Sequence, residues 1–345
     1  MSTPHEEPFQ SYRAKQALID AAWERCEGRF AALPAPLSDL AAQFLRSIAD
    51  ASGSHRSYFS NPVAPPLLYM PLWLMDGLSR DRDRSRADQT MVRILAATMQ
   101  GYIGVRLQDN VLDEPTRGDP HLLLLGNTCF SNMIVELSTA LGMHGIAFWP
   151  ALDRAIVDFS RLTLAEQHAV LRDEPYTVER FDEHADKVAL ARIPLLAVAA
   201  IAERLDLEPS IQALVHQLGI AYGIANDVLG WPRDVRSGHR TWLLGCAGFA
   251  RAEWEHIGAM PEGAERDAAS SAVVEKLRTA LYEGRLLRDA IARAIAVHRD
   301  AMETARAAGL VGFDDYTAER IAWLEMFDKQ TTLMTLRRAL LSARS

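Results

Sequence analysis

The chain has 345 residues, of which 49% are hydrophobic, so it is long enough to bury a large core. Its formal net charge is −8, so the chain lacks the excess of basic residues that a nucleic-acid-binding protein needs. The three cysteines, Cys26, Cys129 and Cys246, have no CxxC spacing, so we expect neither a disulfide framework nor a structural zinc site.

Apolar residues recur every three or four positions along most of the chain, and the alternating pattern of strands is nearly absent. This pattern predicts an all-α protein, and the breaks fall at Pro-rich or Gly-rich points such as LPAPLS (33–38) and RSGHR (236–240). The predicted helices span residues 10–29, 36–50, 66–78, 86–113, 120–143, 150–171, 177–204, 208–230, 241–258, 266–307 and 314–342. We expect a flexible segment at 1–12 and one bundle-like domain at 13–345.

The N-terminal sequence MSTPHEEPFQ is polar and acidic, unlike a secretory signal. No uninterrupted apolar run reaches the roughly 18 residues of a membrane span. The sequence therefore predicts a soluble, cytoplasmic protein that does not cross a membrane.

The first group of acids stands at the end of the predicted helix 86–113, in the sequence QDNVLDE. Asp109 follows Met91 by 18 residues, or five turns, and Asp113 lies one turn further on. The same helix face carries Leu95, Thr98, Tyr102 and Val105. Acids at a helix C-terminus oppose the helix dipole, and carboxylates that continue an apolar face need compensation. Bound Mg²⁺ would supply it, whereas solvated acids at a frayed helix end are the alternative.

The second group of polar residues ends the predicted helix 208–230, where Asn226 follows Val215, Gly219 and Tyr222 at helical spacing. Asp227 would point about 100° away from Asn226, so it is expected to support the metal-binding residues without binding the metal itself. Gly230 and Asp234 lie one and two turns beyond Asn226 if the helix continues, although Pro232 is expected to kink or end it. Asn226, Asp227 and Asp234 are a second candidate set of oxygen ligands.

These two segments resemble motifs of the class I isoprenoid synthases, which include prenyl diphosphate synthases and terpene cyclases. QDNVLDE is similar to the aspartate-rich motif DDxxD, with Asn110 in place of the second Asp, and TRGDP, with Arg117 and Gly118, is similar to the RRGxP that follows in chain-elongating enzymes. NDVLGWPRD resembles the cyclase motif NDxxSxxxE, with Gly230 and Asp234 replacing Ser and Glu. The resemblance spans about residues 60–245 and implies a helical bundle with a central active-site cavity.

The resemblance also implies three Mg²⁺ ions bound together with a diphosphate. Asp109 and Asp113 would hold two of them, and Asn226 with Asp227 or Asp234 the third, with Gly230 contributing only its backbone or a water. Lys187 is similar to the diphosphate-binding Lys of chain-elongating enzymes, and Arg180 resembles the diphosphate-sensing Arg of bacterial cyclases. The implied phosphate contacts are Arg180, Lys187, Arg233 and Arg240, and the implied aromatic walls for a carbocation are Tyr102 and Tyr222.

The departures from the chain-elongating pattern favour a terpene synthase that ionises and cyclises a linear prenyl diphosphate. Residues 60–78 contain no Lys or Arg, whereas chain-elongating enzymes carry a basic stretch there for a second diphosphate. Two alternatives stay open: a prenyltransferase of the polyprenyl diphosphate synthase type, favoured by TRGDP, and an inactive regulatory or partner subunit. The expected partners are the prenyl diphosphate and a second copy of the chain in a homodimer.

Overall fold

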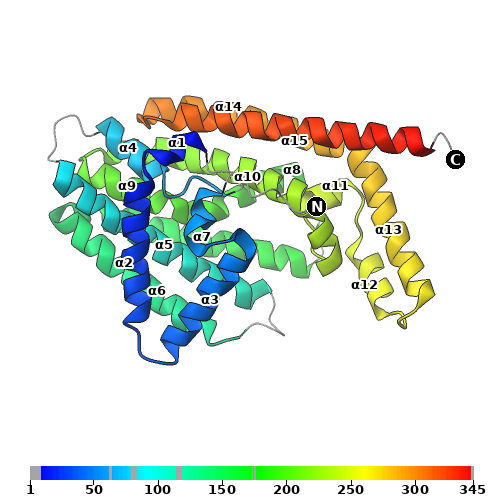
Figure 1. The fold of residues 1–345 in the computed structure, drawn as a ribbon, viewed down its shortest axis with the longest axis horizontal. Helices are drawn as coiled ribbons and strands as arrows, with labels where there is room; N and C mark the ends of the chain where they lie inside the picture. Colours follow the sequence, from blue (N-terminus) through cyan, green and yellow to red (C-terminus); the bar gives the residue numbers. More distant parts are fainter. Residues whose placement is uncertain are drawn as a thin grey trace. The chain divides into compact units, whose positions relative to one another are not determined.

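The computed structural model describes residues 9–61, 64–78, 84–113, 119–172, 174 and 176–342. This part of the chain is helical and contains no strand, so the all-α prediction is confirmed (Figure 1). The α-helices are α1 (Gln10–Arg13), α2 (Gln16–Ala31), α3 (Leu37–Ser52), α4 (Met70–Leu78), α5 (Arg84–Asp113), α6 (Leu122–Leu141), α7 (Gly145–Leu171), α8 (Val178–His184), α9 (Arg192–Ile201), α10 (Glu208–Ser237), α11 (Trp242–Cys246), α12 (Arg251–Ala259), α13 (Ala264–Tyr282), α14 (Leu286–Ala308) and α15 (Phe313–Ser342). The 3-10 segments are η1 (His55–Ser60), η2 (Gly142–His144), η3 (Ala185–Ala191) and η4 (Leu205–Leu207).

Contacts divide the chain into two compact units. Unit 1 comprises Met1–Ala155, Leu190–Gln212 and Ala305–Tyr316, and unit 2 comprises Ile156–Ala189, Ala213–Thr304 and Thr317–Ser345. The single domain expected over residues 13–345 stays a prediction. Among the described residues, no helix has the length and apolar character needed to cross a membrane.

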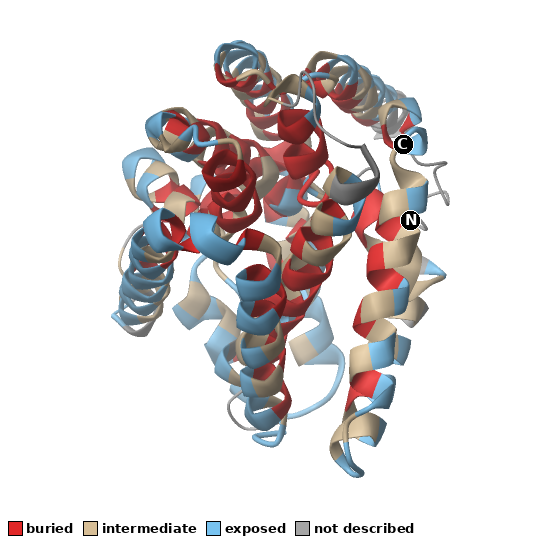
Figure 2. Ribbon diagram, turned by 90° about the vertical axis from the view of Figure 1, so that its left-hand side faces the viewer, coloured by how far each residue is buried: buried red, intermediate tan, exposed pale blue. Residues whose placement is uncertain are grey.

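Unit 1 is built around α5 and α6, which lie side by side (Figure 1). Glycines allow this close approach: a Cβ on Gly104 would lie 3.1 Å from the Phe130 ring, and one on Gly101 would lie 2.6 Å from Sδ of Met133. The helix α9 is buried along its whole length, whereas most helices bury one side and expose the other (Figure 2). This is the pattern that a three- to four-residue apolar repeat dictates.

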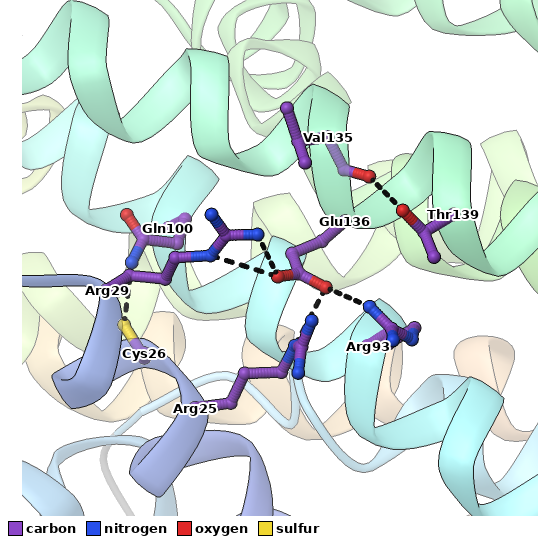
Figure 3. A network of polar contacts seen from close by, with 8 residues as sticks. All are labelled: Arg25, Cys26, Arg29, Arg93, Gln100, Val135, Glu136 and Thr139. Atoms are coloured by element: carbon purple, nitrogen blue, oxygen red, sulfur yellow. Dashed lines mark hydrogen bonds and ion pairs between the residues drawn. The ribbon is translucent and has the colours of Figure 1, made fainter. Parts of the chain in front are cut away.

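A buried carboxylate ties three helices of unit 1 together (Figure 3). Glu136 of α6 is 1% exposed. It accepts hydrogen bonds from Nε of Arg25 at 2.8 Å, from Nε and Nη2 of Arg29 at 3.2 and 2.9 Å, and from Nη1 of Arg93 at 3.0 Å. Because α2 carries two of the arginines and α5 the third, this single side chain fixes α2 and α5 against α6.

The segment before α5 is part of the unit 1 core. Tyr69 stacks on Tyr12 with 3.6 Å between ring centroids, and Trp73 and Tyr316 pack beside them. Tyr12, on α1, is fully buried. The flexible segment expected at 1–12 therefore overlaps a packed helix at its end, while residues 1–8 lie outside the described part.

A hydrophobic core in unit 2 joins α10 to other helices of the unit. Ile224, Val228 and Trp231 of α10 share one hydrophobic core with residues of α8, α11, α13, α14 and α15. A Cβ on Gly219 would lie 2.5 Å from the Ala185 carbonyl oxygen, and one on Gly223 would lie 2.8 Å from the Phe181 ring. These glycines let η3 and α8, the segments that carry Lys187 and Arg180, pack directly on α10.

Several predicted helix boundaries were wrong. The helix predicted to end at 230 continues to Ser237 through Pro232. The helix predicted at 241–258 is interrupted at Gly248, whose φ is 81°, and the one at 266–307 is interrupted at Arg285, whose φ is 64°. A positive φ cannot continue a right-handed helix. Residues 177–204 form α8, η3 and α9 in place of one helix.

Candidate active site

In unit 1 the candidate residues lie at the end of α5. Met91 and Leu95 are buried, Tyr102 is half-buried, and Asp109 is half-buried near the helix end, so the predicted face runs from core toward solvent. The Asp113 side chain, and Arg117 and Gly118, lie outside the described part.

Tyr102 is held in an aromatic group of unit 1. Its hydroxyl lies 2.5 Å from the Tyr58 hydroxyl, and its ring meets Phe59 edge to face at 5.0 Å. Burial raises the pKa of Tyr102 well above its usual value, and the charges of Tyr58 and Asp109 act in the same direction. The phenol therefore stays neutral, and Asp109 lies close enough for its charge to act on this ring.

In unit 2, Asn226 and Asp227 of α10 point to different surroundings. Asn226 is exposed. Asp227 is 6% exposed and accepts hydrogen bonds from the Leu243 N–H at 3.0 Å and from the Thr241 hydroxyl. Burial raises the pKa of Asp227 to about 6, although the hydrogen bond from the Leu243 N–H lowers it in part. Asp227 thus anchors the first turn of α11 to α10, in agreement with the expected divergence of the two side chains.

The continuation of α10 through Pro232 places Asp234 beside Gly230. Asp234 is 3% exposed, and its Oδ1 accepts a hydrogen bond from Nε of Arg233 at 3.0 Å. A Cβ on Gly230 would lie 2.8 Å from Nη2 of Arg233 and 3.0 Å from Oδ2 of Asp234. The space that a Ser side chain of the motif would use is therefore taken by Arg233 and Asp234.

Three other cations predicted to bind phosphate, Arg180, Lys187 and Arg240, belong to unit 2. Arg180 is paired with Glu174, and Nζ of Lys187 with Glu166 at 2.8 Å. Nε of Arg240 lies 4.0 Å from the Cβ position of Gly245 at α11.

The segments that carry these groups pack on one another: the Phe181 ring, next to Arg180 in the chain, lies 5.0 Å from the Trp242 ring of α11, and the Leu243 N–H of α11 donates to Asp227. The charges of Asp227 and Arg180 both act on the Tyr176 phenol, and the charge of Lys187 acts on Asp227. Unit 2 thus brings Arg180, Lys187 and Asp227 together, whereas Asp109 belongs to unit 1.

Tyr222 has a different environment from the one predicted. The Arg320 guanidinium lies over its ring, with 4.9 Å from Cζ to the centroid, and His298 meets it at 5.9 Å. Arg320 is fully buried and also lies 4.6 Å from the Trp323 ring. The ring thus already has a cation on one face. Sequence reasoning did not identify Arg320, because a residue 98 positions away (320 − 222) gives no local signal of this contact.

The donor set in unit 2 fits a magnesium ion that also binds a diphosphate. Mg²⁺ is usually held by one or two carboxylates plus substrate phosphates, not by a complete protein cage. The described residues contain no group of three His, Cys, Asp or Glu side chains around one point. Oδ2 of Asp234 is buried and has no hydrogen-bond partner among the described residues. A buried carboxylate oxygen without a donor is costly, and a cation there would relieve that cost.

Comparisons with known proteins identify the fold. No family model matches this sequence, and no curated protein does. Among solved structures, a polyprenyl synthase from Roseobacter denitrificans has a TM-score of 0.64 at 15% identity, covering 91% of this chain and 97% of that one. A polyprenyl synthase from Caulobacter crescentus, complexed with calcium and isoprenyl diphosphate, has a TM-score of 0.59 at 16% identity over 90% of this chain and 99% of that one. A decaprenyl diphosphate synthase from Rhodobacter capsulatus has a TM-score of 0.59 at 17% identity, over 92% and 99%. The chain therefore has the all-α fold of the class I isoprenoid synthases.

Proposed function

We propose that this protein is a prenyltransferase, which ionises a prenyl diphosphate and joins the prenyl group to an acceptor. The observation that carries the proposal is the similarity along almost the whole chain to polyprenyl and decaprenyl diphosphate synthases. The acids at the end of α5 and the polar residues of α10 support it, because the ionisation of a diphosphate needs metal ligands and phosphate contacts together.

Each candidate residue has a role in this proposal. In unit 1, Asp109 and Asp113 are the residues that would hold Mg²⁺, and in unit 2 Asn226 and Asp234 are the residues that would do so. When bound, Mg²⁺ neutralises the charge that develops on the leaving diphosphate. Asp227 keeps α11 and α10 together, so that Asn226 and Asp234 are held in place.

The cations around α10 provide the second part of diphosphate binding. Arg180 and Lys187 each exchange a carboxylate partner for a phosphate oxygen, and Arg233 and Arg240 approach from the end of α10. Arginine suits this role because its planar guanidinium can donate two parallel hydrogen bonds to one anion. Tyr102 stays neutral and offers an aromatic face to the prenyl chain.

A second candidate function, cyclisation of a linear prenyl diphosphate, is favoured by a specific observation. A chain-elongating enzyme binds a second diphosphate, which needs its own basic side chains. Residues 64–78 carry none, and within them Leu67–Met75 are buried in the core of unit 1. The spacing of Asn226, Gly230 and Asp234 also follows the cyclase motif more closely than the elongating one.

Incubation of the purified protein and Mg²⁺ with geranyl, farnesyl or geranylgeranyl diphosphate, with and without isopentenyl diphosphate, separates these functions. A transferase yields products one isoprene unit longer only when isopentenyl diphosphate is present, or a prenylated form of another added acceptor. A cyclase releases diphosphate and a hydrocarbon or alcohol of unchanged carbon number without an acceptor. If wild type and Asp109→Asn are equally inert with every substrate, the chain is an inactive partner subunit.

A further inference from the structure

A surface hollow of about 310 Å³ in unit 2 is lined by charged side chains on the C-terminal turn of α7, on the residues after it and on α8. Arg172 and Arg180 both line it, as do Glu174 and His184. The hollow is next to the candidate site: the hydroxyl of Tyr176 lies 3.2 Å from Nδ1 of His184, and Cβ of Tyr176 lies 3.9 Å from the Cβ position of Gly245 on α11, the helix whose Leu243 N–H donates to Asp227. Two guanidinium groups on one hollow form an anion-binding arrangement.

The carboxylate of Glu174 currently lies between these two arginines. It pairs with Nη2 of Arg180, and its Oε1 lies 3.5 Å from Nη1 of Arg172. The hydrogen bond from Arg180, helped by Arg172, lowers the pKa of Glu174, so that it is fully charged near neutral pH. Glu174 is thus an anion built into the chain, at the position where an external anion would meet both guanidinium groups.

The pairing is weak enough to be exchanged. The Arg172 side chain is 70% exposed, and those of Arg180 and Glu174 are each 29% exposed. Ion pairs that water can reach contribute little net stability, because solvent screens them and because pairing costs the two side chains conformational freedom. A diphosphate carries more charge than one carboxylate, and it can accept hydrogen bonds from both arginines at once.

We propose that Glu174 is an internal competitor that occupies Arg172 and Arg180 until the substrate diphosphate displaces it, and that Arg172 is a further diphosphate-binding residue. This proposal rests on the proposed function, since it takes a prenyl diphosphate as the ligand. On binding, Arg172 and Arg180 turn from the carboxylate to phosphate oxygens, and no covalent bond changes. Glu174 balances one of the two arginine charges when no substrate is bound, and Glu183, which also lines the hollow, balances the other.

The test is binding of inorganic diphosphate with Mg²⁺, measured by titration calorimetry without any prenyl substrate. Arg172→Gln should weaken binding about tenfold, the effect of losing one charge-assisted hydrogen bond. Glu174→Gln, which removes the competing charge at the same volume, should tighten it several-fold. The controls are Arg161→Gln and Glu255→Gln, which change exposed ion pairs of unit 2 outside the hollow and should leave affinity unchanged.

The opposite signs of the two effects distinguish the proposal from a structural role. If Glu174 only held the fold together, both variants would lose affinity, and Glu174→Gln could not gain it. If wild type binds diphosphate but neither variant changes the affinity, the competitor is refuted while the proposed function stands. If wild type binds no diphosphate and converts no prenyl diphosphate, both are refuted together.

Discussion

The three arginines on Glu136 allow a quantitative prediction for the stability of unit 1. Glu136→Gln keeps the side-chain volume but replaces one acceptor oxygen by an amide donor that faces guanidinium donors. The carboxylate accepts four hydrogen bonds from charged groups. Removing one partner of a buried ion pair typically costs about 3–5 kcal/mol. Because each arginine side chain is still at least 33% exposed, water compensates in part. We therefore expect the free energy of unfolding to fall by about 2–4 kcal/mol.

The matched control is Glu208→Gln, which removes one charge from the pair formed with Arg154. That pair is equally short, at 2.8 Å, but its side chains are 58% and 32% exposed. An exposed pair contributes at most about 1 kcal/mol. Chemical denaturation of wild type and both variants at neutral pH measures the difference. Equal losses for the two variants would refute the argument that burial gives the Glu136 network its strength.

The same network predicts a dependence on pH. Burial alone would raise the pKa of Glu136, but hydrogen bonds from Arg25 and Arg29 outweigh it, so the pKa lies below its usual value. A carboxyl with a lowered pKa stabilises the fold above its unfolded-state pKa and loses that effect as the pH falls through the folded-state pKa. The stability difference between wild type and Glu136→Gln should therefore shrink in acid. A difference that grew in acid would contradict the assignment.

Three further predictions concern the candidate site and its assembly. Asp109→Asn should lower turnover by orders of magnitude without unfolding the protein, and metal removal by a chelator should do the same; near-wild-type turnover would refute the ligand assignment. Asp234→Ala should be as damaging as Asn226→Ala, because α10 continues past Pro232, and an active Asp234→Ala would show that only Asn226 binds metal. Leu124→Glu should convert the expected homodimer to monomer in sedimentation. Leu124 is 57% exposed, and residues 120–152 contain one Asp or Glu, the buried Glu136, and no Lys or Arg. A dimer that survives this charge would place the interface elsewhere.

The period of apolar residues was sufficient to predict the long helices and the direction of Asp109, because both follow from 3.6 residues per turn. The path of α10 was not predictable in this way. Proline removes a hydrogen bond and normally ends a helix, at a cost of about 3 kcal/mol. Trp231 and Val235, on either side of Pro232, are 6% and 1% exposed. Burying two such side chains stabilises by about 1.5–3 kcal/mol each, which offsets the proline.

The ion pairs of the candidate cations were also beyond sequence reasoning. Lys187 and Glu166 are 21 residues apart, on η3 and α7. The resemblance of Arg180 to the diphosphate-sensing Arg of bacterial cyclases gives no indication of its pairing with Glu174. Ion pairs between two segments depend on how those segments pack, whereas the helical period of a sequence gives only the directions of side chains within one helix. The start of α11 was closer to the prediction, which began a helix at residue 241. Thr241 caps α11 by accepting a hydrogen bond from the Leu244 N–H, and Thr directly before an apolar turn is a common helix start.

The position of the charged groups in unit 1 bears on the acceptor of a transferase. Arg93 precedes Asp109 by 16 residues on α5, which is about 24 Å along a helix, and its guanidinium is held by Glu136. That cluster of arginines is therefore too far from Asp109 to hold a second diphosphate beside the ionised bond, and α4, which has no basic residue, is mostly buried. An unpaired diphosphate would lose hydration at a cost of several kcal/mol. We therefore expect a transferase with these features to prefer an acceptor without a diphosphate, unless the basic residue Arg117 supplies the missing charge. If wild type prenylates neutral acceptors and does not use isopentenyl diphosphate, the result agrees with this argument. If wild type instead elongates with isopentenyl diphosphate and Arg117→Gln loses that activity, Arg117 is the group that binds the second diphosphate.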